Sequence, residues 1–173
     1  MTNKDVMREL FVVGLKNAHA VEKQALSIMT PQVSRIENYP EVADRLRLHI
    51  DETNGQIARL DELLASFETS GSALKDMGLS MSGSMAALAH SVAGDEIIKN
   101  SFANYAFEHF EIASYKSLLV IADDGGFSNA TAALKQSLGE EESMAQWIDD
   151  NLAAVTRKYA SLYAAGGSSE AKV

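Results

Sequence analysis

Several glutamates stand at positions where helical periodicity calls for an apolar side chain. Glu22, Glu108 and Glu141 each interrupt such a pattern near the middle of its segment, and Glu111 lies one helical turn after Glu108. A buried, ionised carboxylate is costly unless it is paired or bound to a metal. The sequence shows no matching set of inward-facing lysines or arginines. The pattern therefore predicts that divalent cations balance these carboxylates in the core.

A second pair of candidate ligands lies on another segment, where His49 and Glu52 are three residues apart. Residues at this spacing project from one side of a helix. The pair can therefore complete the site from a segment other than the three that carry the glutamates above. Thr53 falls in the apolar stripe of this segment and Glu52 on its flank, and the sequence leaves open whether His49 or Gln56 contacts the metal. The predicted ligand set is Glu22, His49, Glu52, Glu108, Glu111 and Glu141.

Each glutamate taken alone has a simpler interpretation, because a single glutamate at the edge of a helical stripe is usually solvated. Glutamates in register on three segments favour a shared site. The remaining histidines are weaker candidates. We interpret His19 and His109 as surface or outer-shell groups, and His90 is assigned no role.

The chain contains no cysteine, which limits the chemistry of any metal site. Disulfides, thiolate ligands and cysteine nucleophiles are excluded, so a metal must bind through oxygen or imidazole. Iron and manganese suit carboxylate ligands with some imidazole. No Ser-His-Asp order, glycine-rich phosphate loop or zinc-spacing motif is apparent in the sequence.

The elements that position these residues are predicted to be long helices, because apolar residues recur at helical spacing. The expected helices cover, in order, residues from Asp5 onward, about 41–67, about 95–122 and from about 128. Pro31 should kink or break the first helix, since it removes a backbone donor. Phe102 and Tyr105 are expected on the inner stripe of the third helix.

The segment over residues 73–93 is rich in methionine, alanine, serine and glycine, which predicts a connector holding one or two short helices. Two short connections and this long one match an all-α four-helix bundle with a single crossover. We expect one domain, a bundle over residues 1–165, followed by a flexible tail over residues 166–173.

The chain carries a formal net charge of -9 and no cluster of lysine and arginine. Nucleic acids and anionic membranes attract concentrated positive charge, so neither is an expected partner, whereas cations are. The first residues lack a basic stretch followed by an apolar one, and no apolar run is long enough for a membrane span. We therefore expect a cytoplasmic protein.

Three motifs resemble the YciF-like stress-protein family of the ferritin-like superfamily. The first is Val21-Glu22-Lys23-Gln24, similar to the family's Ala-Glu-Lys-Gln. The second runs from Glu52-Thr53 through Gln56 to Arg59-Leu60, and the third, the most specific, is Glu108-His109-Phe110-Glu111-Ile112-Ala113. The similarity extends over about residues 5–160.

The resemblance implies a ferritin-like bundle of rubrerythrin type, a homodimer, a dinuclear metal centre and a role in stress response. Ferritin-like di-iron sites commonly take a Glu-x-x-His pair from each of two helices. This chain departs from that pattern, because Gly55 stands three residues after Glu52 and Met144 three residues after Glu141. The resemblance then implies a centre richer in carboxylate and poorer in imidazole.

Two hypotheses of different class follow. In the first, two iron ions, or manganese ions, react with dioxygen or peroxide as in a ferroxidase or peroxidase. Tyr105 and Tyr115 are then either hydrogen-bond donors beside the metals or core aromatics. In the second, the bundle holds metal for stability or not at all and acts as a structural or interaction protein. The sequence alone does not decide whether the protein is an enzyme.

Overall fold

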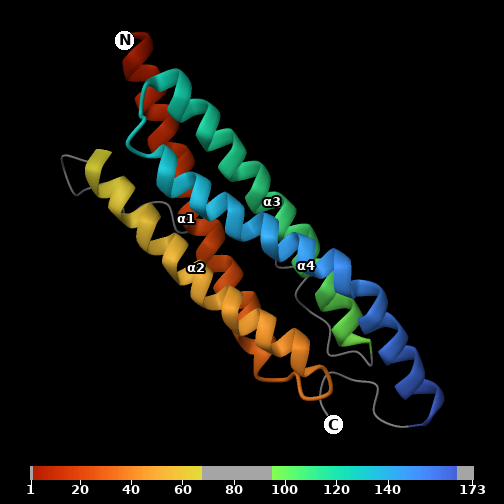
Figure 1. Cartoon of the computed structure of the whole chain (residues 1–173). Coiled ribbons are helices and arrows are strands. Elements are labelled where there is room, and N and C mark those ends of the chain that lie inside the picture. Colours follow the sequence, from red (N-terminus) through yellow and green to blue (C-terminus); the bar gives the residue numbers. More distant parts are fainter. Residues whose placement is uncertain (1, 68–94, 167–173) are drawn as a thin grey trace.

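The described part of the chain consists of four long helices and contains no strand. The computed structural model describes residues 2–67 and 95–166. The helices are α1 (Asn3–Val33), α2 (Pro40–Phe67), α3 (Glu96–Gly125) and α4 (Thr131–Ala164) (Figure 1). The predicted all-α four-helix bundle is therefore confirmed for these residues. None of the described helices is long and apolar enough to cross a membrane.

Helix α1 begins with a reciprocal cap. The Thr2 hydroxyl accepts a hydrogen bond from the backbone N–H of Asp5 at 3.3 Å, and the Asp5 carboxylate accepts one from the backbone N–H of Thr2 at 2.9 Å. The helix continues past Pro31 and ends at Val33, so the break expected at Pro31 comes slightly later. Proline is tolerated there because the backbone hydrogen bond that it removes lies close to the helix end.

Short connections join α1 to α2 and α3 to α4. Ile36 and Tyr39 are buried in the first connection, and α2 begins at Pro40, where proline's fixed φ suits the first turn of a helix. Helix α3 is closed by Gly126, whose φ of 71° lies in the left-handed region that glycine adopts without a steric penalty.

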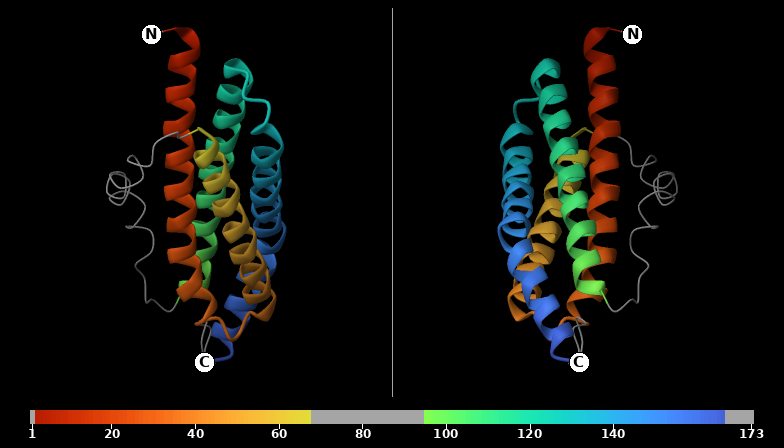
Figure 2. Two further views of the ribbon diagram at one scale, coloured as in Figure 1. Left: turned by 90° about the vertical axis from the view of Figure 1, so that its left-hand side faces the viewer. Right: turned by 90° about the vertical axis from the view of Figure 1, so that its right-hand side faces the viewer.

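Helix α1 packs against α2 and α3, and α4 packs against α3 and α2. The end of α2 and the start of α3 lie at opposite ends of the bundle (Figure 2), which is the arrangement expected of a bundle with a single crossover. The short helices expected in this connection, His90 and the tail beyond residue 166 lie outside the described residues.

Two apolar clusters fill the bundle on either side of a polar layer. The first cluster includes Val21, Leu46, Phe107 and Met144. The second includes Ala18, Leu60, Tyr115 and Leu134. Between the clusters each helix contributes a buried polar or charged side chain, namely Glu22, His49, Glu108 or Glu141. The predicted interruptions of the apolar pattern thus fall at one level of the bundle.

The inner stripe of α3 differs from the prediction at Phe102, which is 55% exposed. The buried residues of this helix are Ile97, Asn104, Phe107, Glu108, Glu111, Ile112, Tyr115, Leu118 and Ala122. Polar and charged residues hold several positions on the inner face, so the face cannot be located from apolar residues alone. Tyr105 is only partly buried and packs against the edge of the first cluster.

Candidate metal centre

The polar layer holds residues from all four helices, and nearly all are inaccessible to solvent. Its fully buried members are Glu22, His49, Thr53, Gln56, Glu108, Glu111, Ser137 and Glu141. The exposed fractions of the four glutamates are between 0% and 2%. Such burial is rare for a carboxylate that has no partner.

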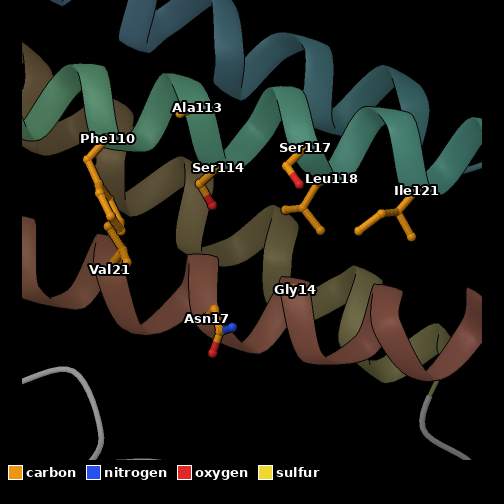
Figure 3. A pocket seen from close by; sticks show the side chains of 9 residues that line it. All are labelled: Gly14, Asn17, Val21, Phe110, Ala113, Ser114, Ser117, Leu118 and Ile121. Carbon is orange, nitrogen blue, oxygen red and sulfur yellow. The ribbon is translucent and has the colours of Figure 1, made fainter.

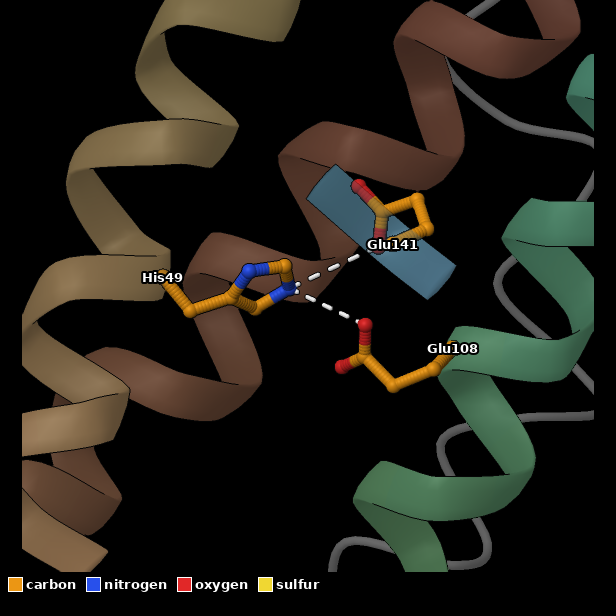
Figure 4. A group of neighbouring side chains, drawn as sticks. All are labelled: His49, Glu108 and Glu141. Atoms are coloured by element: carbon orange, nitrogen blue, oxygen red, sulfur yellow. Dashed lines mark ion pairs between the residues drawn. The ribbon is translucent and has the colours of Figure 1, made fainter. Parts of the chain in front are cut away.

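His49 faces two glutamates across the bundle (Figure 4). Its Nε2 atom lies 3.0 Å from Oε2 of Glu108 and 3.5 Å from Oε2 of Glu141. Despite this ion-pair contact, neither Nε2 of His49 nor Oε2 of Glu108 has a hydrogen-bond partner. One ligand atom from each of the three residues lies within 4.8 Å of the others. A nitrogen and two carboxylate oxygens at this separation can hold one metal ion.

Glu52 lies behind His49, on the side away from the buried glutamates. Its Oε2 atom is 2.8 Å from Nδ1 of His49 and 3.0 Å from Nη1 of Arg45, and its side chain is 22% exposed. Because the carboxylate is an acceptor here, Nδ1 of His49 carries the proton. Burial raises the pKa of Glu52, but His49 and Arg45 outweigh burial and hold it below its usual value. Glu52 therefore orients the imidazole and leaves Nε2 facing the centre.

Glu22 of α1 and Glu111 of α3 are the other two buried glutamates of the layer. The Tyr115 hydroxyl donates a hydrogen bond of 2.5 Å to Oε1 of Glu22, whereas Oε2 of Glu22 has no partner. Neither carboxylate oxygen of Glu111 has a hydrogen-bond partner. Glu22 and Glu111 thus enter the layer from two helices that pack together, α1 and α3.

Gln56 connects the layer to a salt bridge at its rim. Its Nε2 donates to Oε1 of Glu141 and, at 3.1 Å, to Oε2 of Glu140. Arg59 in turn pairs with Glu140 and donates from Nε to Oγ of Ser137 at 3.1 Å. This chain of contacts was not predicted from the sequence. The available signal was the spacing of Gln56 and Arg59, which are seven and ten residues after His49.

Burial and mutual repulsion alter the acidity of the layer. Burial raises the pKa of Glu22 to about 8 and that of Glu141 to about 7, with a neighbouring carboxylate adding to each shift. The pKa of Glu111 is well above its usual value because of burial and the negative charges of Glu22, Glu141 and Glu108. Burial alone would lower the pKa of His49, but the carboxylates of Glu108, Glu141 and Glu52 outweigh it and raise the pKa to about 12.

Arginines neutralise only the outer carboxylates of the site. Arg45 of α2 pairs with Glu52, and Arg59 of α2 pairs with Glu140 of α4; both ion pairs lie at the rim of the polar layer. The four buried glutamates face a single buried imidazole. If all were ionised and His49 protonated, negative charge would remain in excess.

Seven buried side-chain nitrogen or oxygen atoms in the described chain lack a hydrogen-bond partner, and all lie in this layer. They are Oε2 of Glu22, Nε2 of His49, Oε1 of Gln56, Oε2 of Glu108, both carboxylate oxygens of Glu111 and Oε2 of Glu141. Buried polar atoms without partners are uncommon in folded proteins. Carboxylate oxygens and imidazole are the donors that iron and manganese take, so the residues fit such ions.

The other described histidines stand apart from the layer. His19 lies 3.0 Å from Asp61 near the surface, and His109 is exposed with its ring 4.6 Å from that of Tyr105. Their positions agree with the interpretation of both as surface or outer groups. The layer thus brings together Glu22, His49, Glu108, Glu111 and Glu141, with Glu52 at its edge.

A family model described as "Domain of unknown function (DUF892)" matches residues 6–161. The chain belongs to the DUF892 family. The predicted YciF-like membership is confirmed by this match and by a relative, Protein YciF of Escherichia coli K12. That protein is 28% identical over 149 residues, which cover 82% of this chain and 87% of the relative.

Solved structures similar to this DUF892 protein share its helical fold. A crystal structure from Xanthomonas campestris pv. campestris has a TM-score of 0.75 at 31% identity and covers 90% of this chain and 96% of its own. The crystal structure of the E. coli stress protein YciF has a TM-score of 0.71 at 26% identity and covers 88% of this chain and 96% of its own. These likenesses support the four-helix bundle of the described residues.

Proposed function

We propose that this DUF892 protein is a dinuclear metal-binding protein of ferritin-like type, with iron or manganese held in the polar layer. The observation that carries the proposal is the set of unpartnered buried atoms, all of which converge on this layer. Glu22, His49, Glu108, Glu111 and Glu141 would hold the ions. Divalent cations would balance the excess negative charge and supply the missing partners of these atoms.

When bound, iron or manganese would supply redox chemistry toward dioxygen or peroxide, as in a ferroxidase or peroxidase. The chain's own residues prepare the site for this role. Glu52 orients His49, Tyr115 holds one oxygen of Glu22, and Gln56 holds one oxygen of Glu141. The apolar clusters on either side keep bulk water away from the layer.

The test is metal analysis of protein produced with iron and manganese available and purified without chelator. We expect about two ions per chain, in line with dinuclear bundles. Re-addition of either metal to chelator-treated protein should raise the melting temperature by about 5 °C or more at saturation. Protein that contains no metal and melts at the same temperature with and without these ions would contradict the proposal.

Reactivity is tested separately. The protein is loaded with iron(II) under anaerobic conditions, and peroxide or dioxygen is then added. Oxidation to iron(III) faster than in a matched solution of free iron(II) would support a ferroxidase or peroxidase. The E. coli relative is described as a stress protein, and from this likeness we propose a stress-response role for this chain. The cytoplasmic location stays a prediction from the sequence.

A second function, as an interaction protein, is favoured by the outer face of α1 and α3. A pocket of about 310 Å³ lies between these helices (Figure 3), and none of the described residues that line it is charged. Leu10, Val13 and Phe110 on the same two helices are 50%, 45% and 41% exposed. A second copy of the chain is the occupant that we propose for this face, giving the homodimer implied by the family resemblance.

A further inference from the structure

We infer that the metal centre contains two chemically unequal cation positions. The first is built by His49, Glu108 and Glu141 and takes a borderline transition-metal ion. The second is built by Glu22 and Glu111 and takes a hard cation such as Mn²⁺. This inference rests on the metal centre proposed above and adds which ion class each half accepts.

The first position contains the only buried imidazole of the described chain. Glu52 accepts the Nδ1 proton of His49 at 2.8 Å, so Nε2 faces the centre and becomes a ligand once a metal ion replaces the proton on that atom. The ligand atoms of His49, Glu108 and Glu141 lie within 4.8 Å of one another. Imidazole beside carboxylate favours ions late in the Irving–Williams order, such as Zn²⁺, over Mn²⁺.

The second position has oxygen donors only. Glu22 and Glu111 are not among the residues whose ligand atoms lie within 4.8 Å of one another, and both are buried on helices that pack together, α1 and α3. Each residue is 1% exposed, and together they offer three oxygens without a hydrogen bond. These unpartnered oxygens, rather than the acidity of the cluster, point to a bound cation.

No second imidazole reaches these two glutamates from the described residues. His19 pairs with Asp61 near the surface, and His109 is exposed against Tyr105. A pair of carboxylates without nitrogen suits Mg²⁺ or Mn²⁺ better than a softer ion. The two halves of the layer therefore differ in their donors, and their metal preferences should differ accordingly.

The experiment uses chelator-treated, full-length protein. One equivalent of Zn²⁺ is added first, followed by Mn²⁺, and the six-line electron paramagnetic resonance signal of free Mn²⁺ reports its binding. We expect the Zn²⁺ to stay bound while the chain takes up about one Mn²⁺ ion. Added in the reverse order, Zn²⁺ should displace Mn²⁺ from one position only.

Two variants assign the positions. His49→Gln should weaken Zn²⁺ binding by about 100-fold or more, because loss of even an outer partner of a ligand costs about 10–100-fold. Mn²⁺ binding at the second position should be retained in this variant. Glu111→Gln should weaken Mn²⁺ binding at the second position and retain Zn²⁺ binding at the first. His109→Gln and Glu142→Gln are matched controls, since both residues are exposed neighbours of proposed ligands.

The outcomes separate this inference from the proposal on which it rests. Wild-type protein that binds neither Zn²⁺ nor Mn²⁺ rejects the metal centre and the inference together. Wild-type protein that binds two ions of either metal with equal affinity, or variants that each lose both ions while remaining helical, overturn the inequality and leave the metal centre standing. The wild-type series decides the question if either variant fails to fold.

Discussion

The hydroxyl of Tyr115 in α3 donates a hydrogen bond of 2.5 Å to Oε1 of Glu22 in α1. This contact holds one oxygen of Glu22, whereas the other, Oε2, is buried without a partner. We predict that Tyr115→Phe weakens metal binding by about 10-fold, as expected for the partner of a ligand, without loss of helix. Calorimetric titration with Mn²⁺ measures the change. Tyr105→Phe, which alters only an exposed contact to Asp149, is the control and should bind as wild type does.

Glu52 is predicted to act on metal binding through His49. In Glu52→Ala the imidazole loses the acceptor at Nδ1, and we expect affinity for Zn²⁺ to fall by about 10–100-fold. The exposed Asp51, its neighbour on α2, provides the control variant Asp51→Ala. Equal Zn²⁺ affinity in both variants and the wild type would show that Glu52 does not orient the ring.

The pH dependence of stability should reverse when metal is bound. Without metal, the raised pKa values of Glu22 and Glu141, about 8 and about 7, mean that the folded protein holds protons that the unfolded chain releases. Their contribution to stability is full below the unfolded pKa of about 4.3 and is lost as the pH rises through the folded values. The raised pKa of His49, about 12, acts in the same direction above about pH 6.5.

Metal binds the deprotonated carboxylates and competes with protons, so the stabilisation by metal should grow with pH. Two urea-unfolding series between about pH 5 and pH 8, one with chelator and one with saturating Mn²⁺, measure both trends. Stability should decline across this range with chelator, and the gap between the curves should widen. Parallel curves would indicate glutamates that titrate as they do at a surface.

Phe11 tests the apolar packing independently of the metal. Its ring is fully buried and stacks on Phe127 at 5.0 Å and edge-on to Phe67 at 5.1 Å. We expect Phe11→Ala to lower the free energy of unfolding by about 3–5 kcal/mol in urea titrations. Phe102→Ala, at a 55% exposed position, should change it by less than about 0.5 kcal/mol. Similar losses in both variants would contradict the assigned core.

A charge introduced at Val13, an exposed apolar residue of α1, tests the outer face of α1 and α3 as the dimer interface. We predict that the wild type sediments as a dimer and that Val13→Glu sediments as a monomer, because a charge buried at an interface is not compensated. Leu48→Glu places the same charge at an exposed apolar position of α2, which is 54% exposed, and should remain dimeric. A wild-type monomer, or a dimer that persists in Val13→Glu, would exclude this face as the interface.

The sequence alone determined the helical fold and the level at which the bundle departs from an apolar core. Glu22, Glu108 and Glu141 were identifiable because each interrupts a helical repeat, and that repeat is a local property of the chain. The connections were predictable for the same local reason, since Pro40 and Gly126 have conformational preferences that act at the ends of helices.

Only the tertiary structure decided which polar residues meet. Glu52 and Gln56 are both on α2, yet the rotation of this helix buries Gln56 completely and leaves Glu52 at the rim with Arg45. Spacing along one helix fixes neither its rotation nor its height against its neighbours, because these depend on packing across the whole bundle. The approach of Tyr115 to Glu22, 93 residues away in the chain, is a product of that packing and has no signature in the sequence.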